Sequence, residues 1–252
     1  MSVNSSDLIK LHKSILLEKK FLRQVFAEIY TTCIKLRNKY FTSSGIEIEI
    51  GSGSSFFKQM YGGIISSDIK SNSGVDIIVD AQAMPFNDKE VRALYAINCF
   101  HHLSDPDKFF CELIRVLKVG GGAVLVEPYF GLVARYFYKY LFSTEHFDMA
   151  QSEWVATQKN HDVMTGANQA LSYIVFFRDR AAFEAKYPSL EIIESMVLHN
   201  YLRYLLSGGL NFKSLVPDFF MPIVKTIEFL LIPLSSILAL HHIIIIRKKN
   251  VV

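Results

Sequence analysis

The stretch that most constrains the fold is residues 46–56, which runs from an alternating segment through two glycines to a helix start. Its first five residues alternate isoleucine with glutamate, which is typical of a short β-strand. Gly51 and Gly53 lack a Cβ, so the backbone can turn sharply there and a ligand can lie against it. A helix is predicted to begin at Phe56, capped by Ser55 or the serine before it. This order predicts a nucleotide-binding turn at the carboxyl edge of an α/β sheet.

The neighbours of the two glycines narrow the identity of the ligand. A dinucleotide fingerprint would carry a third glycine where Phe56 stands, and a phosphate-binding P-loop would end in Gly-Lys-Ser/Thr. Glu49 instead precedes Gly51 by two positions. A carboxylate at the strand end repels a pyrophosphate and attracts a cation, such as a sulfonium that also carries an ammonium group. The pattern therefore favours a cationic ligand, and an oxidoreductase that uses NAD or a nucleotide sugar is the least favoured alternative.

Further along the chain, polar residues again stand where predicted strands end. Apolar or β-rich runs occupy residues 62–68, 75–79, 93–98 and 123–128. The polar residues at their ends are Asp68, Asp80, Asn98 and Glu127. Ligands of parallel sheets bind beyond the carboxyl ends of the strands, so we expect these residues to lie near the glycine turn. Asp68 follows Gly51 by about 17 residues, close to the offset of an acid that binds ribose hydroxyls, although it could also simply form a turn.

The alternation of strands with helical segments predicts a doubly wound, mostly parallel α/β sheet. Residues 1–40 are expected to form an N-terminal helix that packs on the sheet as a lid. Residues 41–200 are expected to form the ligand-binding domain, with a sixth strand near 190–198. A helix is expected over 170–186, and a strand over residues 173–177 is the alternative.

Composition excludes some functions. The formal charge of +3 is small and the basic residues are scattered, so nucleic acid is not expected as a partner. Cys33, Cys99 and Cys111 lie in apolar runs without CxxC spacing, which indicates free thiols in a reducing compartment. The first residues lack the pattern of a secretory signal, so we expect a cytoplasmic protein.

Residues 46–128 resemble the class I S-adenosylmethionine (SAM) methyltransferases, in particular the methyltransferase type 11-like family. The matching motifs are Glu49-x-Gly51-x-Gly53, Asp80-Ala81-x-x-Met84-Pro85-Phe86, His101-His102-x-x-Asp105-Pro106 and Leu117-Lys118-Val119-Gly120-Gly121. Val119 replaces the usual proline, and Ser55 stands at the family's third glycine. The resemblance implies a Rossmann-like class I methyltransferase fold with SAM as the cofactor.

The resemblance also implies roles for individual residues. Glu49, Gly51 and Gly53 would hold the methionyl part of SAM, and Asp68 would bind the ribose hydroxyls. For the remaining parts of the cofactor, Asp80 and Ala81 would bind the adenine, and the backbone of Asn98 would bind the amino-acid part.

The adjacent His101 and His102 allow two interpretations. No metal site is predicted, because neighbouring histidines on a regular element point apart and no third ligand has a suitable spacing. Either histidine is a weak candidate for the general base of a hydroxyl acceptor, and a structural role is the alternative.

Residues 129–170 interrupt the strand pattern with many aromatic residues. An insertion after the fifth strand would lie over the ligand, so Tyr129, Tyr136 and Tyr138 are candidates for the acceptor pocket. Equally, these aromatic side chains could fill a small core of their own.

Residues 201–252 are predicted to form a hydrophobic helical appendage. Positions 229–246 carry no formal charge and are followed by Arg247-Lys248-Lys249, a pattern that fits an amphipathic segment on an anionic membrane surface. Packing against the domain, or against a second copy in a homodimer, is the alternative.

Together these features predict SAM-dependent methyl transfer to a small-molecule or lipid/glycan-type acceptor, which would be lipid-linked if the tail contacts the membrane. A catalytically idle SAM-fold scaffold is the alternative, and retention of both Asp68 and Asp80 argues against it.

Overall fold

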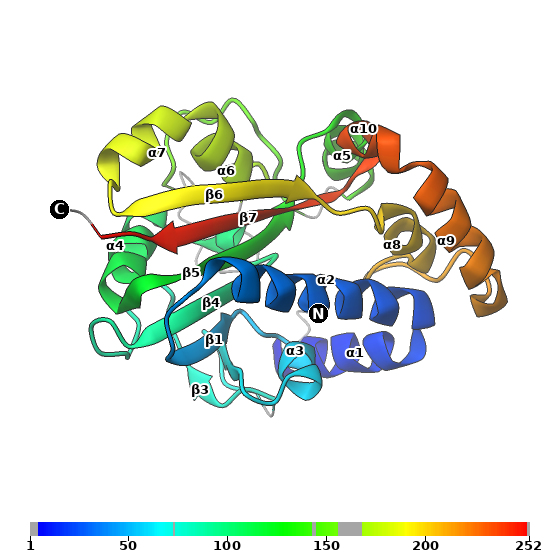
Figure 1. Cartoon of the computed structure of the whole chain (residues 1–252). Helices are drawn as coiled ribbons and strands as arrows, with labels where there is room; N and C mark the ends of the chain where they lie inside the picture. Colours follow the sequence, from blue (N-terminus) through cyan, green and yellow to red (C-terminus); the bar gives the residue numbers. More distant parts are fainter. Residues whose placement is uncertain (1–4, 73, 143–144, 156–167, 251–252) are drawn as a thin grey trace.

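A single seven-stranded sheet forms the centre of the molecule, with helices on both faces (Figure 1). The computed structural model describes residues 5–72, 74–142, 145–155 and 168–250. The strand order is β3-β2-β1-β4-β5-β7-β6. The first five strands in this order are parallel, and β7 runs antiparallel to both of its neighbours. The predicted doubly wound, mostly parallel sheet is therefore confirmed.

The sheet contains each strand that the sequence predicted and one more. The strands are β1 (Ile46–Ile50), β2 (Ile65–Asp68), β3 (Ile77–Ile78), β4 (Val91–Ile97), β5 (Leu117–Pro128), β6 (Leu190–Val197) and β7 (His241–Lys248). β7 is the additional strand.

Helices occupy most of the remaining segments. The α-helices are α1 (Ser5–Glu18), α2 (Lys20–Tyr40), α3 (Phe56–Met60), α4 (Pro106–Val116), α5 (Leu132–Tyr136), α6 (Leu171–Tyr173), α7 (Arg180–Lys186), α8 (Tyr201–Ser207), α9 (Met221–Leu230) and α10 (Ser235–Leu238). Short 3₁₀ or π turns are η1 (Phe100–His102), η2 (Phe137–Leu141), η3 (Ile174–Arg178), η4 (Asp218–Phe220) and η5 (Ile232–Leu234). The predicted N-terminal helix is thus two helices, and residues 170–186 are helical as expected.

Each face of the sheet buries its own core. On one face, α4, η3 and α7 pack on side chains of the central strands. On the other face, α2 and α3 pack on the alternate side chains of the same strands. β7 contributes to both cores, because Ile244 and Ile246 lie in the first and Ile243 and Ile245 in the second. The α2 helix therefore packs on the sheet, and its role as a lid stays a prediction.

The prediction of a helical appendage over residues 201–252 is wrong for its final part. Residues 241–248 form β7, which pairs along its length with β5 on one side and β6 on the other. Four consecutive β-branched isoleucines favour a strand, and a strand buried on both faces has a continuous apolar sequence. That sequence has the same composition as a membrane-contacting segment, which is why the pattern misled the prediction.

The basic end of the tail is tied into the domain rather than free. Arg247 forms an ion pair with Glu191 at 2.9 Å. The Lys248 ammonium donates hydrogen bonds to the carbonyls of Ile114 and Leu117 at 2.5 and 2.8 Å. These contacts anchor the end of β7 beside α4. Two of the three basic residues in the run 247–249 therefore have side-chain partners within the domain.

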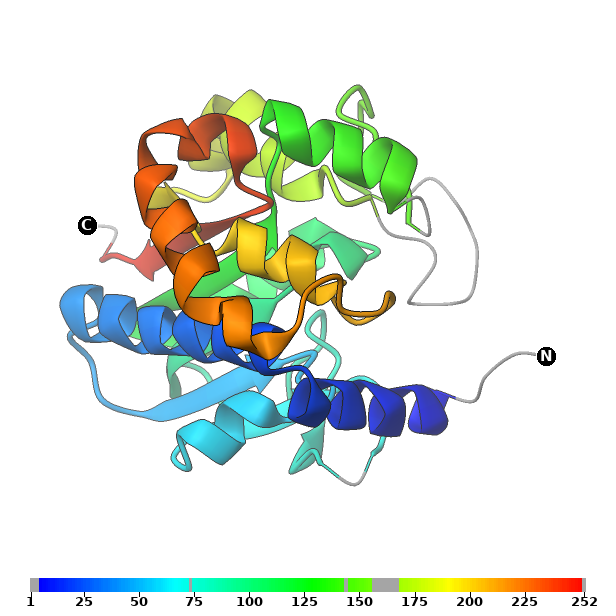
Figure 2. The ribbon, with the colours of Figure 1, turned by 90° about the vertical axis from the view of Figure 1, so that its right-hand side faces the viewer.

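The helical part of the appendage is joined to the N-terminal region by an ion-pair network in which Arg203 and Glu228 are buried and Glu28 is partly exposed. Arg203 of α8 donates to Glu228 of α9 at 2.5 Å and, through both terminal nitrogens, to Glu28 of α2 at 2.6 Å. Figure 2 shows α8 and α9 beside α2. Of the helices that the structure describes, none alone is long and apolar enough to cross a membrane. The pair Asp218–Leu230 and Ile232–Leu238, bent by 59°, meets the length and composition together.

If β7 is an essential interior strand of the sheet, truncating one of its isoleucines should destabilise the whole domain. Ile244→Ala is expected to lower the free energy of unfolding by about 3 kcal/mol, because the side chain is fully buried. Ile237→Ala, on the partly exposed α10, is expected to cost less than about 1 kcal/mol. Urea unfolding followed by circular dichroism measures both values, and equal losses would contradict the assignment.

Candidate functional site

The glycine turn after β1 has the geometry that its sequence suggested. Gly51 and Gly53 have φ angles of +65° and +50°, which favour glycine. A Cβ on Gly51 would come within 2.6 Å of the Cys99 sulfur, so this glycine permits close packing of the loops after β1 and β4. A Cβ on Gly53 would meet no atom within 4 Å. Gly53 therefore borders open space in which a ligand could lie.

Hydrogen bonds fix this turn against the end of β2. The Ser52 amide donates to the Ser67 carbonyl at 2.8 Å, and the Ser67 amide donates back to the Ser52 hydroxyl at 2.9 Å. The Gly53 amide donates to the Asp68 carboxylate at 3.1 Å. Asp68 thus lies directly beside the glycine turn, where the sequence placed it.

Glu49 is a buried acid with unused hydrogen-bonding capacity. Its side chain is 3% exposed, and its Oε2 atom accepts no hydrogen bond. Burial raises the pKa of Glu49 to about 8, and the nearby Asp68 carboxylate adds to the rise. Keeping such a group buried is costly unless something donates to it. The site therefore fits a cationic donor.

Two more buried polar atoms near this edge lack partners. Ser55 occupies the predicted cap position but makes no cap hydrogen bond, and its hydroxyl is buried and unpartnered, so the predicted cap is wrong. The Asn98 side-chain oxygen is also buried without a partner, while the Asn98 amide donates to Val126 at 2.7 Å. Native proteins rarely leave buried polar atoms unpaired, so the three atoms together indicate a polar ligand.

The segment predicted to bind adenine forms a tight turn. One Asp80 carboxylate oxygen accepts from the Gln82 amide at 2.8 Å, and the Asp80 carbonyl accepts from the Ala83 amide at 3.0 Å. Ala81 is buried beside them. These hydrogen bonds show that Asp80 forms a turn, and a role of the segment in adenine binding stays a prediction.

A second polar group lies at the ends of β4 and β5. Glu127, fully buried at the end of β5, accepts from the amides of Cys99 and Phe100 at 3.0 and 2.8 Å. Its other oxygen lies 2.5 Å from Nδ1 of His101. One carboxylate therefore holds both the backbone of η1 and the imidazole of His101.

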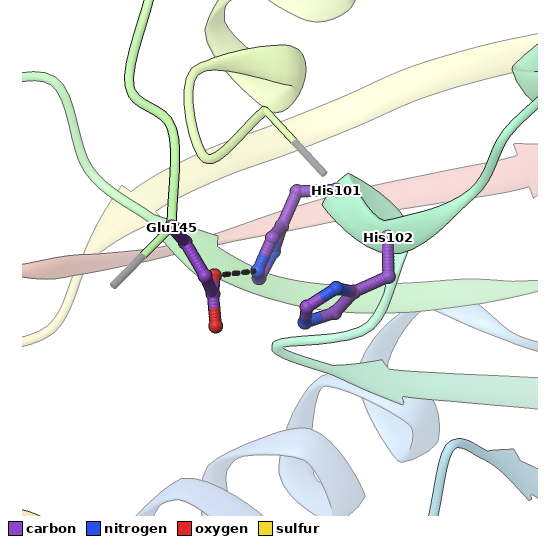
Figure 3. Close-up of side chains that lie close together, drawn as sticks. All are labelled: His101, His102 and Glu145. Atoms are coloured by element: carbon purple, nitrogen blue, oxygen red, sulfur yellow. Dashed lines mark hydrogen bonds and ion pairs between the residues drawn. The ribbon is translucent and has the colours of Figure 1, made fainter. Parts of the chain in front are cut away.

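Glu145, from the insertion, completes this group (Figure 3). Its Oε2 lies 3.2 Å from Nε2 of His101 and accepts from the Gln169 amide group at 3.1 Å. The ring of His102 lies beside that of His101, with centroids 4.2 Å apart. Ligating atoms of His101, His102 and Glu145 all lie within 4.8 Å of one another. A third potential ligand therefore lies near the two histidines, although the sequence spacing did not indicate one.

The proton of His101 is held between two carboxylates. Burial alone would lower the pKa of His101, but Glu127 and Glu145 together raise it to about 9. Burial opposes ionisation of Glu145, but its hydrogen bond with His101 lowers the pKa of that carboxyl. His101 is therefore protonated at neutral pH in this arrangement and cannot accept a further proton, which leaves His102 as the better candidate base of the two.

The glycine turn and the histidine group are neighbours. Burial raises the pKa of the Cys99 thiol, and the carboxylates of Glu127, Asp68 and Glu49 each add to the effect. Cys99 therefore lies among the acids of both groups, in agreement with its approach to Gly51.

Of the three tyrosines proposed for an acceptor pocket, Tyr129 and Tyr138 belong to one apolar cluster and Tyr136 lies outside it. Tyr138 is buried, and its hydroxyl donates to the Leu240 carbonyl at 2.8 Å, which is a packing role. Tyr136 is exposed beside Tyr140. Tyr129 lies against an imidazole of β7. Within the insertion, residues 143–144 and 156–167 lie outside the described residues.

Comparison with known proteins gives a family match for part of the chain. Residues 64–125 match the family described as "Methyltransferase domain". The match begins just before β2, so it excludes the glycine turn, and it ends within β5. No curated protein matches the sequence.

Solved structures resemble the chain at low identity. Geranyl diphosphate C-methyltransferase from Streptomyces coelicolor A3(2), solved with Mg²⁺, geranyl diphosphate and S-adenosyl-L-homocysteine, has a TM-score of 0.48 and 15% identity. That alignment covers 90% of this chain and 83% of the other. Phosphoethanolamine N-methyltransferase 2 from Haemonchus contortus, solved with SAM, has a TM-score of 0.47 and 13% identity over 99% of this chain and 61% of the other. Similarities at this level say nothing about the acceptor.

If the buried Glu49 carboxyl serves ligand binding, it is expected to lower the free energy of unfolding of the ligand-free protein. Glu49 is protonated in both the folded and unfolded states below its ordinary pKa of 4.5. As pH rises from there to about 8, only the unfolded state ionises, so the free energy of unfolding falls. Glu49→Gln removes this loss and should be more stable than wild type at pH 8, by on the order of 3 kcal/mol.

The matched control is Glu47→Gln, two residues earlier on β1. Glu47 forms an ion pair with Arg92 at 3.0 Å, so this variant should lose stability. Urea unfolding at pH 5 and pH 8 compares the two variants with wild type. A Glu49→Gln variant less stable than wild type at pH 8 would contradict the prediction.

Proposed function

We propose that this chain, which carries a class I SAM-dependent methyltransferase domain, transfers a methyl group to an oxygen or nitrogen atom of a small-molecule or lipid-linked acceptor. The observation that carries the proposal is the unpartnered, buried Glu49 oxygen beside the open glycine turn. Bound SAM supplies a methyl group on a positively charged sulfur, together with an ammonium group. Both charges suit a site whose nearest ionisable groups are acids.

The cofactor would be held by residues from successive strand ends. Glu49, Gly51 and Gly53 would hold the methionyl part, where an ammonium group would donate to the unpartnered Glu49 oxygen. Asp68 would accept from the ribose hydroxyls with the oxygen that faces away from Gly53. For adenine and the amino-acid part we propose Asp80, Ala81 and the backbone of Asn98, whose amide is already used by Val126 and whose carbonyl could accept.

The chain's own contribution to catalysis would be alignment and dehydration of the reacting groups. The rigid hydrogen bonds between the β1 and β2 ends fix the cofactor side. The histidine group lies on the neighbouring strand ends, where an acceptor would approach. Holding two reactants in one geometry can supply much of the rate acceleration of a methyl transfer.

An idle scaffold is a weaker interpretation of the same site. A protein with no ligand at this edge would be more stable with an apolar or amide side chain in place of Glu49, because the buried acid destabilises the fold. The presence of Glu49, Ser55 and Asn98 with unpartnered atoms therefore favours a binding role.

Cofactor binding is tested by calorimetry with SAM and S-adenosylhomocysteine. Gly53→Ala should weaken binding at least tenfold, because its Cβ enters the open space at the turn. Asp68→Ala should cost ~1–3 kcal/mol of binding free energy. Gly63→Ala is the matched control, since its Cβ would also meet no atom within 4 Å but its backbone does not have a positive φ angle. Folded wild-type protein that gives no heat, or equal binding by both glycine variants, would contradict the assignment.

We further propose that an apolar face on the appendage and the insertion contacts a lipid surface. On residues 212–238, Leu215, Phe219 and Phe229 are each more than 70% exposed. α10 packs beside α5, so the face continues onto α5 and η2. The exposed apolar or aromatic residues there are Leu132, Tyr136, Tyr140 and Leu141. Contiguous exposed apolar surface of this kind is typical of a binding face.

The charges of this apolar face favour an anionic membrane over a second protein copy. Its exposed charged residues are Arg135, Lys139, Lys213, Asp218 and Lys225, and the acid of α9, Glu228, is buried against Arg203. Basic residues therefore outnumber acids around the apolar surface, which suits anionic headgroups and opposes self-association through like charges. An enzyme held there would reach a lipid-linked acceptor.

Vesicle flotation tests the membrane proposal. Wild-type protein should float with vesicles that contain anionic lipid, and the double variant Phe219→Ser/Phe229→Ser should stay at the bottom. The control variant Ile78→Ser/Val119→Ser alters exposed apolar residues elsewhere and should float. Wild-type protein that stays at the bottom contradicts the proposal. If it is then a dimer in solution and the first double variant is a monomer, the face is a dimer interface.

A further inference from the structure

The group formed by His101, His102 and Glu145 has the composition of a metal site. Two imidazoles and one carboxylate bring their ligating atoms within 4.8 Å of one another. Both histidines come from η1, and Glu145 approaches from across the site (Figure 3). Zinc and similar ions lie about 2.0–2.2 Å from nitrogen and oxygen ligands, so the ligand atoms around one ion are roughly 3–3.5 Å apart. Small side-chain rotations would bring the three atoms to that spacing.

The surroundings of the group resemble those of built metal sites. A metal-binding histidine generally donates its second ring nitrogen to a carboxylate, which fixes the ring orientation. Glu127 occupies that position on Nδ1 of His101, at 2.5 Å, and leaves Nε2 directed at Glu145. Gln169 in turn donates to Glu145 at 3.1 Å. The contacts of Glu127 and Gln169 orient a ligand from outside the group, whereas the hydrogen bond between His101 and Glu145 would be replaced by the ion.

The charges also suit a divalent ion. Glu127 and Glu145 bring two negative charges into a largely buried site, where protonated His101 balances one of them. A divalent cation that displaces the proton from Nε2 of His101 would balance both. Imidazole ligands favour transition metals over Mg²⁺ and Ca²⁺, which prefer oxygen ligands.

We propose that His101, His102 and Glu145 bind one divalent transition-metal ion, with Glu127 as the positioning residue of His101. Three protein ligands leave coordination positions open, as in catalytic zinc sites. The substrate class follows if the proposed methyl transfer is also correct. A hydroxyl oxygen of the acceptor would take an open position, and the ion would promote loss of its proton to solvent. An amine acceptor, already protonated at neutral pH, would not suit the site.

Metal binding is tested directly on the full-length chain, freed of metal by a chelator and dialysis. Zn²⁺ alone and Co²⁺ alone are titrated by calorimetry, and the Co²⁺ complex is examined by visible absorption for nitrogen ligands. One equivalent of each ion should bind. His102→Gln and Glu145→Gln should each weaken binding at least tenfold. Both residues are only partly buried, so these variants are expected to fold, which thermal unfolding checks.

His146→Gln is the matched control, because His146 follows Glu145 directly, is 58% exposed and lies outside the group. It should bind both ions like wild type. Folded wild-type protein that binds neither ion overturns the proposal, as does undiminished binding by both ligand variants, or loss of binding in His146→Gln. Titration of the same samples with S-adenosylhomocysteine separates the two proposals, since a chain that binds this ligand but no metal has lost only the metal site.

Discussion

The hydrogen bonds of one buried carboxylate, Glu127, determine how the functional edge of the sheet is arranged. Its oxygens accept from three successive amides of the segment after β4 and from the ring of His101. The loop that follows β4 therefore has a fixed position relative to β5. Cys99 lies in that loop and packs against Gly51, so the position of the glycine turn depends on the same carboxylate. Without it, neither the cofactor side nor the histidine group would have a defined geometry.

The parts of the fold that the sequence could predict are those with local signals. Alternation in residues 46–50 and the apolar run before Glu127 each indicate a strand, and β1 and β5 are found there. A polar residue at the end of a strand can likewise be located without knowing the topology, because all carboxyl ends of parallel strands meet at one edge. Glu49, Asp68 and Glu127 lie at that edge for this reason.

The parts that could not be predicted depend on contacts between distant residues. Glu145 meets His101 only because the insertion folds back over η1, and no spacing rule relates positions so far apart. The isoleucines at 243–246 form an apolar run that fits a buried strand or a buried helix equally well. They form a strand because β5 and β6 both have an edge with which this segment can pair. Tyr138 shows the same limit, because whether an aromatic side chain lines a pocket or fills a core depends on Leu240 beside it.

The position of β7 in the sheet determines when the sheet and its two cores can be completed during synthesis. β7 lies between β5 and β6 but leaves the ribosome after both of them. Until residue 248 has emerged, β5 keeps an unpaired edge and the two cores lack the isoleucines that join them. Open edges and bare apolar faces promote association between unfinished chains. The nascent protein is therefore most prone to aggregate while the appendage is being translated, and the strand that ends this exposure inserts between β5 and the edge strand β6.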